Sequence, residues 1–254
     1  MACKVKDIAR VIEDLAPLDT CVPGDNCGLL LGSMERQVKR AVLALDVNAR
    51  VADFAISQGA QLIIAHHPVF FEPIMNLTAD EPLGRIVEKI IKNGISLYCA
   101  HTNFDACKIG TSRALAMAAG AEMTVQQGFI AFADIKETTV EQLAQGLSKS
   151  ISSPYVNIFG GGKVSKIAVC AGSGNDEMKA VIAGGADVYI CGELKYHQLT
   201  EYIERGVSVI TCGHRESELP ALPGLKQYLQ THENLIQYTI EYFIADGMYT
   251  KELR

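Results

Sequence analysis

Several features that define common protein classes are missing from this sequence. Its 254 residues include no tryptophan and only 8 prolines and 22 glycines, which excludes a collagen-like or mucin-like composition. No apolar run approaches the roughly 18–20 residues that a membrane-spanning helix needs. The eight cysteines contain no Cys-x-x-Cys pair, so a zinc ribbon and a thioredoxin motif are excluded as well. With 48% hydrophobic residues, the chain has the composition of a globular protein with a substantial core.

An excess of positive charge is also missing. The 23 Lys and Arg residues against 29 Asp and Glu residues give a net charge of −6, which argues against a nonspecific nucleic-acid binder. The N-terminus carries charges where a secretory signal peptide needs an apolar stretch, and its apolar residues have helical spacing. We therefore expect a cytoplasmic protein that does not bind a membrane. Its negative charge argues against nucleic acid as a partner.

Short apolar runs that alternate with amphipathic segments are the main structural signal. The runs predict buried strands at 41–47, 61–65, 95–100, 167–171, 187–191 and 207–212. The segments between them predict helices at 49–58, 83–92, 176–183 and 199–204. Such alternation is typical of mainly parallel sheets that helices cover on both faces. Four cysteines in these runs are expected to be buried, reduced thiols: Cys99, Cys170, Cys191 and Cys212.

An internal repeat organises the chain. Residues 41–67 align without a gap on residues 167–193 at an offset of 126, strand on strand and helix on helix. Residues 101–105 continue the match over residues 214–218 at an offset of 113, and the missing 13 residues correspond to the loop 68–80 of the first half. We therefore expect an α/β protein of two related three-layer lobes. The first would span residues 1–124 and the second residues 125–254, with a C-terminal tail that can pack back on the first lobe.

Three consecutive glycines, Gly160 to Gly162, lie between the two copies of the repeat. A phosphate-binding loop would continue with Gly-Lys-Ser or Gly-Lys-Thr and a helix, whereas an apolar strand follows here. The glycines are therefore expected to form a tight hairpin turn, after a helix predicted at 140–148.

Five of the six histidines lie at the ends of predicted strands or directly beyond them: His66, His67, His101, His197 and His214. In parallel α/β sheets the carboxyl ends of the strands bind ligands, because the connecting loops diverge there. Adjacent side chains on a strand point to opposite faces, so His66 and His67 converge only if the backbone turns. Two such imidazoles could each hold one of two neighbouring metal ions.

Carboxylates follow two of these histidines at the same spacing. Asp105 comes four residues after His101, and Glu218 comes four residues after His214, which places each pair on one face if the segment is helical. Imidazole and carboxylate ligands suit Zn, Fe, Mn, Ni or Mg. A carboxylate such as Glu218 can bridge two ions about 3.5–4 Å apart, as in two-metal hydrolytic sites. One such histidine alone is more often a hydrogen-bonded loop residue, but the repeated pattern favours a metal site.

The sequence resembles the Nif-three-like, YbgI-like family of dinuclear metal-centre proteins, also named GTP cyclohydrolase 1 type 2 homologs. The motifs that carry the resemblance span nearly the whole chain: residues 25–29 (DNCGL), 65–68 (AHHP), 101–105 (HTNFD), 168–174 (AVCAGSG), 192–197 (GELKYH) and 213–218 (GHRESE). The chain departs from the family pattern at Gly24, where tryptophan is common, at Glu193, where aspartate is common, and at Arg215. The side chain of Arg215 could bind a phosphate or could be solvated.

The resemblance implies roles for the histidines and carboxylates. His67 and Asp105 would bind one metal ion, His66 and His214 would bind the other, and Glu218 would bridge both. His101 and His197 would line the same cavity as acid–base candidates. The family also implies a toroidal homohexamer whose metal sites face an internal cavity.

Two functions are compatible with such a centre. The first is a metal-dependent hydrolase acting on a small, phosphorylated molecule, with two divalent metal ions per chain that activate water. GTP cyclohydrolase chemistry, nucleotide hydrolysis and phosphoester hydrolysis are all open, because a fold and its metals do not fix a substrate. The second is a non-enzymatic metal carrier, chaperone or regulatory scaffold. Open coordination positions would favour the enzyme.

Overall fold

The computed structural model describes residues 2–248, and the chain divides into two compact units. The first unit comprises the chain up to Cys107 together with the segment from Leu225 onward, and the second comprises Lys108–Gly224. We expected the second lobe to begin at residue 125. It begins earlier because α5 (Thr111–Ala118) packs on β6 and β8 of the second unit. The C-terminal segment returns to the first unit as the edge strand β11 (Glu241–Ile244).

The first unit is built around a five-stranded sheet in the order β1-β4-β3-β2-β11. Its strands are β1 (Gly28–Leu31), β2 (Arg40–Ala44), β3 (Leu62–Ala65), β4 (Ser96–Cys99) and β11. Its helices are α1 (Val5–Leu15), the 3-10 turn η1 (Leu18–Thr20), α2 (Ala49–Ser57), α3 (Pro82–Lys92), α4 (Thr102–Asp105) and most of α10 (Ala221–Thr231). Only the pairing of β1 with β4 is antiparallel. The strands predicted at 41–47, 61–65 and 95–100 are confirmed.

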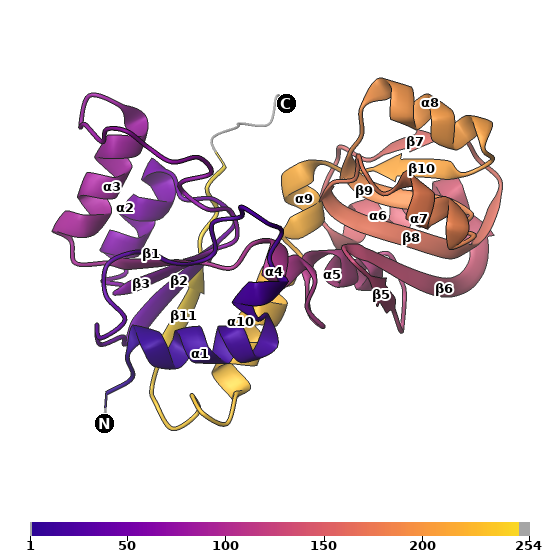
Figure 1. The fold of residues 1–254 in the computed structure, drawn as a ribbon. Coiled ribbons are helices and arrows are strands. Elements are labelled where there is room, and N and C mark those ends of the chain that lie inside the picture. Colours follow the sequence, from indigo (N-terminus) through magenta and orange to yellow (C-terminus); the bar gives the residue numbers. More distant parts are fainter. Residues whose placement is uncertain (1, 249–254) are drawn as a thin grey trace. The chain divides into compact units, whose positions relative to one another are not determined.

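Helices cover both faces of this first sheet (Figure 1). On one face α2 and α3 pack on alternate strand residues, including Val42, Ile63 and Leu97. On the other face lies α1, whose Glu13 accepts a 2.8 Å hydrogen bond from the hydroxyl of the fully buried Tyr98. The alternation of strand side chains thus produces the three layers that the apolar runs predict.

The second unit contains a six-stranded sheet in the order β5-β6-β8-β9-β10-β7. Its strands are β5 (Val125–Gln127), β6 (Ile130–Thr139), β7 (Asn157–Phe159), β8 (Lys163–Ser173), β9 (Val188–Glu193) and β10 (Ser208–Thr211). Its helices are α5, α6 (Val140–Ser150), α7 (Met178–Ala183), α8 (Tyr196–Glu204) and α9 (His214–Glu218). The central strands β8, β9 and β10 are parallel, whereas the pairings toward the edges are antiparallel.

Two cores lie on the two faces of this second sheet. One core joins α5 and α6 to strand residues such as Val188 and Ile190. The other joins α7 and α8 to the intervening residues Tyr189 and Cys191. All four cysteines expected to be buried, reduced thiols are buried and outside any disulfide: Cys99, Cys170, Cys191 and Cys212.

The repeat predicted from the sequence is present in the structure. The elements β2-α2-β3 correspond to β8-α7-β9, and β4-α4 corresponds to β10-α9. In both units the two strands on either side of the helix are parallel, β2 with β3 and β8 with β9. The prediction of a hairpin at Gly160–Gly162 is wrong. The glycines do connect β7 to β8, but β7 pairs with β10, and the backbone N–H of Gly161 donates to Ser208 Oγ at 3.1 Å. Among the described residues, no helix is both long and apolar enough to cross a membrane.

Candidate functional site

Two adjacent histidines leave the carboxyl end of β3. The backbone N–H groups of His66 and His67 still donate to Ala44 and Leu45, so both residues continue the pairing with the β2 segment. The chain bends at these positions, and the two imidazole rings lie with their centroids 5.0 Å apart. The backbone turn that their convergence requires is therefore present.

The parallel register brings a third histidine to the same edge of the first sheet. Ala65 of β3 lies opposite Cys99 of β4, so the segment that continues β4 carries His101 alongside His67. The ring centroids of these two histidines are 5.6 Å apart. One nitrogen each of His66, His67 and His101 lies within 4.8 Å of the others. We call these three residues, together with Asp105, the imidazole cluster.

Asp105 joins the cluster through the short helix α4. Its backbone N–H donates to the carbonyl of His101 at 3.0 Å, which is the helical i to i+4 relation that the spacing predicts. Its Oδ1 lies 3.5 Å from Nε2 of His66. The His66 side chain is only 2% exposed, whereas those of His101 and Asp105 are 20% and 18% exposed. The cluster therefore has a buried floor and a side that solvent reaches.

The Nδ1 atoms of the cluster are held by oxygen atoms. His66 Nδ1 lies 3.0 Å from the carbonyl of Ala100, His67 Nδ1 lies 2.9 Å from Asp46 Oδ1, and His101 Nδ1 lies 2.9 Å from Asp25 Oδ1. An oxygen acceptor favours the tautomer with the proton on Nδ1, which leaves the Nε2 lone pair to bind a cation. This arrangement is typical of histidines that bind metals.

Asp25 is the more enclosed of the two carboxylate acceptors. Burial alone would raise the pKa of its carboxyl, but hydrogen bonds from Thr102 and His101 outweigh burial and hold that pKa well below its usual range. Thr102 donates through both its backbone N–H and its hydroxyl. Asp25 is thus an ionised acceptor that fixes the ring of His101.

The second unit presents a smaller group at the corresponding edge. His214 and Glu218, the first and last residues of α9, lie with Nε2 and Oε1 3.1 Å apart. Nδ1 of His214 lies 3.1 Å from Oε1 of Glu193, which ends β9. The Glu218 side chain is 6% exposed and that of His214 is 39% exposed. We call His214 and Glu218 the α9 pair.

Gly172 leaves space beside the α9 pair. A Cβ atom at this position would lie 2.5 Å from Glu218 Oε1 and 3.3 Å from His214 Nε2. Its φ of +68° belongs to the left-handed region that favours glycine. The backbone N–H of Gly172 donates to Ser217 Oγ at 2.8 Å, which ties this loop to α9. The second unit therefore keeps room next to two atoms that can bind a cation.

These donor sets fit divalent cations. Imidazole nitrogens with held tautomers and carboxylate oxygens are ligands for Zn, Fe, Mn or Ni. The first unit contains His66, His67 and Asp105, and the second contains His214 and Glu218.

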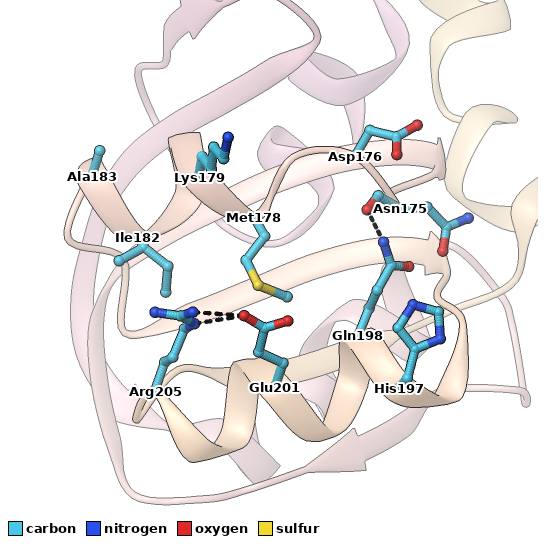
Figure 2. Close-up of a pocket in the computed structure, with 10 residues that line it drawn as sticks. All are labelled: Asn175, Asp176, Met178, Lys179, Ile182, Ala183, His197, Gln198, Glu201 and Arg205. Atoms are coloured by element: carbon cyan, nitrogen blue, oxygen red, sulfur yellow. Dashed lines mark hydrogen bonds and ion pairs between the residues drawn. The ribbon is translucent and has the colours of Figure 1, made fainter.

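His197, the second acid–base candidate, lies elsewhere in the second unit. It lines a surface cavity of about 700 Å³ between α7 and α8, and His214 and Glu218 are not among the residues that line this cavity (Figure 2). Gln198 beside it donates to the carbonyl of Asn175, and the Arg205–Glu201 ion pair lies toward the other end of the cavity.

Arg215, for which the sequence left two roles open, forms an ion pair with its neighbour in α9. Its Nη1 lies 3.0 Å from Oε1 of Glu216, and its side chain is 26% exposed. The guanidinium is therefore partly buried and ion-paired rather than fully solvated.

Sequence reasoning missed the carboxylates that orient the histidines. The sequence places Asp46 in a predicted strand and Asp25 and Glu193 in family motifs, and none of these patterns indicates that they hold a histidine. The signal that could have found Asp46 is the register: Ala44 lies opposite Ala65, so the residues two positions further on, Asp46 and His67, are neighbours.

Comparison with known proteins adds to this geometry. A model of the Duf34/NIF3 (NGG1p interacting factor 3) family matches residues 3–248. The protein named GTP cyclohydrolase 1 type 2 homolog from Clostridium perfringens is 34% identical over 231 residues, which cover 86% of this chain and 88% of that protein. A protein of the same name from Methanocaldococcus jannaschii is 31% identical over 242 residues and covers 91% of this chain and 97% of its own length.

Solved structures show the same fold. A Bacillus cereus protein related to NIF3 superimposes with a TM-score of 0.88 at 21% identity, covering 100% of both chains. Reduced HcgD from Methanocaldococcus jannaschii superimposes with a TM-score of 0.81 at 28% identity, covering 97% of this chain and 99% of its own. Since the family model extends over almost the full length and the relatives match in both sequence and fold, the chain belongs to the Duf34/NIF3 family.

Proposed function

We propose that this protein is a metal-dependent hydrolase acting on a nucleotide or another phosphoester, with two divalent cations bound by His66, His67, Asp105, His214 and Glu218. The observation that carries the proposal is the orientation of the histidines. His66, His67 and His214 each hold Nδ1 against an oxygen atom and thereby present Nε2 as a ligand. Histidines that served only to fill a core would not need an acceptor on the same ring atom in all three cases.

Divalent cations in such a set lower the pKa of water and polarise a phosphoryl or ring-carbon electrophile. The exposure of the cluster fits a catalytic role better than a closed structural one. His66 forms the buried floor, while His67 and His101 remain 15% and 20% exposed, so water and a small substrate can reach them.

The protein itself supplies a candidate for proton transfer. His101 lies within the cluster, and its Nδ1 is held by the ionised carboxylate of Asp25 at 2.9 Å. Because Asp25 holds Nδ1, Nε2 of His101 is the ring atom that can accept a proton and return it. We propose His101 as the acid–base residue and Asp25 as the residue that positions it. His197, in the α7–α8 cavity, stays a weaker candidate for a catalytic role.

Charge explains why a phosphorylated substrate needs the cations. The net charge of the chain is −6, and the cluster contains the carboxylate of Asp105 and contacts those of Asp25 and Asp46. These carboxylates would repel a phosphate, whereas bound cations would reverse the local charge. The names of the relatives as GTP cyclohydrolase 1 type 2 homologs point in the same direction, toward a nucleotide.

A hydrolysis screen tests the proposal. Metal-loaded protein is incubated with nucleoside triphosphates, including GTP, and with simple phosphoesters, beside His67→Ala and a matched control, His232→Ala. His232 is the sixth histidine, and its ring packs against Tyr228 at the end of α10. We expect turnover by the wild type and by His232→Ala and a loss of at least about 100-fold in His67→Ala. Equal activity in His67→Ala would indicate a contaminant, and a metal-loaded wild type without turnover would favour a metal carrier.

The homohexamer that the resemblance implies stays a prediction. The loop 68–80, which only the first half of the repeat has, carries four exposed apolar side chains: Phe71, Ile74, Met75 and Leu77. Met75 is 98% exposed, so the loop offers an apolar surface that a second copy of the chain could cover. Light scattering of the purified chain measures the assembly directly, and a monomer would contradict it.

A further inference from the structure

Two of the eight cysteines differ from the others in exposure. Cys21 and Cys27 are partly exposed, whereas the other six are buried: Cys3, Cys99, Cys107, Cys170, Cys191 and Cys212. The two partly exposed cysteines also lie close together, because the Sγ atoms of Cys21 and Cys27 and one oxygen of Asp25 all lie within 4.8 Å of one another. Solvent can therefore reach both thiols of this close pair.

A tight turn brings the two cysteines together. The backbone N–H of Asp25 donates to the carbonyl of Val22 at 3.0 Å, and Gly24 has a φ of +89°, as a type II turn after Pro23 requires. Residues 21–27 form neither helix nor strand, so the chain on both sides of the turn can adjust. A disulfide needs the two sulfur atoms to approach to about 2 Å, which side-chain rotation and a small loop adjustment can supply.

The thiols differ in reactivity. A hydrogen bond from Cys99, together with one from Cys21, lowers the pKa of the Cys27 thiol to about 7, against the opposing effects of burial and of the Asp25 carboxylate 3.3 Å away. Burial, followed by the hydrogen bond to Cys27, raises the pKa of Cys21 to about 12. Cys27 is therefore the thiol that reacts first, since the thiolate is the nucleophile.

Asp25 does not offer a free carboxylate that would make this group a third metal site. Its Oδ1 accepts from His101 and from the backbone N–H of Asn26, and its Oδ2 accepts from Thr102 and lies 3.3 Å from Cys27 Sγ. A cation would have to displace these donors.

We propose that Cys27 and Cys21 are a peroxide-sensitive dithiol, in which Cys27 is oxidised and Cys21 closes an intramolecular disulfide. The proposal does not depend on the hydrolase assignment, because it concerns the thiols themselves.

The chemistry balances with hydrogen peroxide as the oxidant. The Cys27 thiolate attacks one peroxide oxygen, the O–O bond breaks, and the products are the Cys27 sulfenic acid and hydroxide. The sulfur of Cys21 then attacks the sulfenic sulfur, the S–O bond breaks, and the leaving oxygen departs as water with the proton of Cys21. The hydroxide takes up the proton that the Cys27 thiol released, so two thiols are oxidised and one peroxide is reduced to two molecules of water.

The disulfide would act on the imidazole cluster through Asp25. This residue lies between the two cysteines in the chain, and its carboxylate holds the ring of His101. Drawing the two ends of the turn together moves the Asp25 carboxylate or alters its hydrogen bonds. Oxidation is therefore expected to change the environment of the His101 ring.

Differential alkylation with mass spectrometry tests the dithiol. Cys21 and Cys27 lie in one tryptic peptide, residues 11–36, which contains no other cysteine. After mild treatment with hydrogen peroxide, unfolded wild-type chain should show six alkylatable thiols instead of eight, and this peptide should be lighter by two hydrogens. A dithiol reductant should restore both thiols. Cys3→Ser, a control in a buried cysteine, should keep the bond.

Two variants separate the roles of the cysteines. In Cys21→Ser the bond cannot form, and Cys27 should be trapped by dimedone as a sulfenic acid. In Cys27→Ser, Cys21 should remain fully alkylatable after peroxide. Independent oxidation of the two thiols, disulfides between chains, or thiols that a chelator must first release would each overturn the proposal.

The effect on His101 has its own measurement. Ring proton and nitrogen resonances of His101 should shift when the wild type is oxidised and return on reduction, while Cys21→Ser should show no such shift. An oxidised wild type whose His101 resonances stay in place would overturn the link through Asp25.

Discussion

The two units use the same strand–helix framework to present different ligands. At the offset of 126 residues, His67 of the first unit corresponds to Glu193 of the second, and Asp46 corresponds to Gly172. In the first unit the carboxylate of Asp46 holds the imidazole of His67. In the second unit the strand-end residue Glu193 is itself the carboxylate, and it holds the imidazole of His214.

This difference shows how a repeated framework can diverge at its strand ends while the core stays the same. The first unit has a cluster of imidazoles with a buried floor. The second unit has one imidazole, one buried carboxylate and the space beside Gly172. Imidazole nitrogens confer preference for transition metals, whereas a carboxylate has two oxygens and can bind two cations at once. The two ligand groups therefore complement each other chemically.

The largest effect is expected from removing the carboxylate of the second unit. Glu218→Ala deletes a buried acid whose Oε1 lies 3.1 Å from His214 Nε2. Because we propose that Glu218 binds both cations, metal content measured by mass spectrometry should fall from about two ions per chain to below one. Glu216→Gln, on the same helix but paired with Arg215, is the matched control and should keep both ions. Unchanged metal content in Glu218→Ala would exclude Glu218 as a shared ligand.

A smaller effect is expected from filling the space beside the α9 pair. Gly172→Ala and Gly206→Ala both place a side chain at a positive φ, +68° and +80°, so each should cost about 1 kcal/mol in the free energy of unfolding. A Cβ at Gly172 would meet Glu218 and His214, whereas a Cβ at Gly206 would meet nothing within 4 Å. Titration with Co²⁺ should therefore show at least about tenfold weaker binding in Gly172→Ala alone. Equal affinity for Co²⁺ in the two variants would mean that a bound cation does not use the space beside Gly172.

Much of the fold could be predicted because its elements depend on local patterns. The apolar runs gave the central strands of both sheets, and the repeat gave their correspondence. The hairpin at Gly160–Gly162 could not be predicted correctly, because the choice of β10 as the partner of β7 depends on contacts about 50 residues away. The start of the second unit at Lys108 likewise depends on the packing of α5 on β6 and β8, which its own sequence does not reveal.

The candidate site could be predicted only in part. The positions of the histidines at predicted strand ends indicate a site, and in the structure His66, His67 and His101 lie close together. The carboxylates behind them depend on strand order and register. Asp25 reaches His101 because β1 pairs with β4, with Gly28 opposite Cys99, and no feature of the N-terminal segment alone indicates this pairing. The sequence also does not reveal that His197 lines the α7–α8 cavity, because this position depends on tertiary packing.

The smallest effect compares one ionised carboxylate in each unit as the pH falls. Burial would raise the pKa of both Asp25 and Asp187, but hydrogen bonds outweigh it. Asp25 accepts from Thr102 and His101, which lowers its pKa. Asp187 accepts from the backbone N–H groups of Ser165 and Lys166, which lowers its pKa as well. A carboxyl whose pKa is lower in the folded than in the unfolded chain stabilises the fold above its unfolded pKa of about 3.9. That contribution is lost as the pH falls through the folded value.

Asp25→Asn and Asp187→Asn should therefore each lower the free energy of unfolding by about 1–2 kcal/mol at neutral pH, as expected for lost hydrogen bonds to a charged group. Measured by urea unfolding of metal-free protein, the difference from the wild type should stay constant down to about pH 4 and shrink below it. Only Asp25→Asn should also shift the ring resonances of His101, because only Asp25 holds that ring. A stability difference that grows as the pH falls would contradict the direction of both pKa shifts.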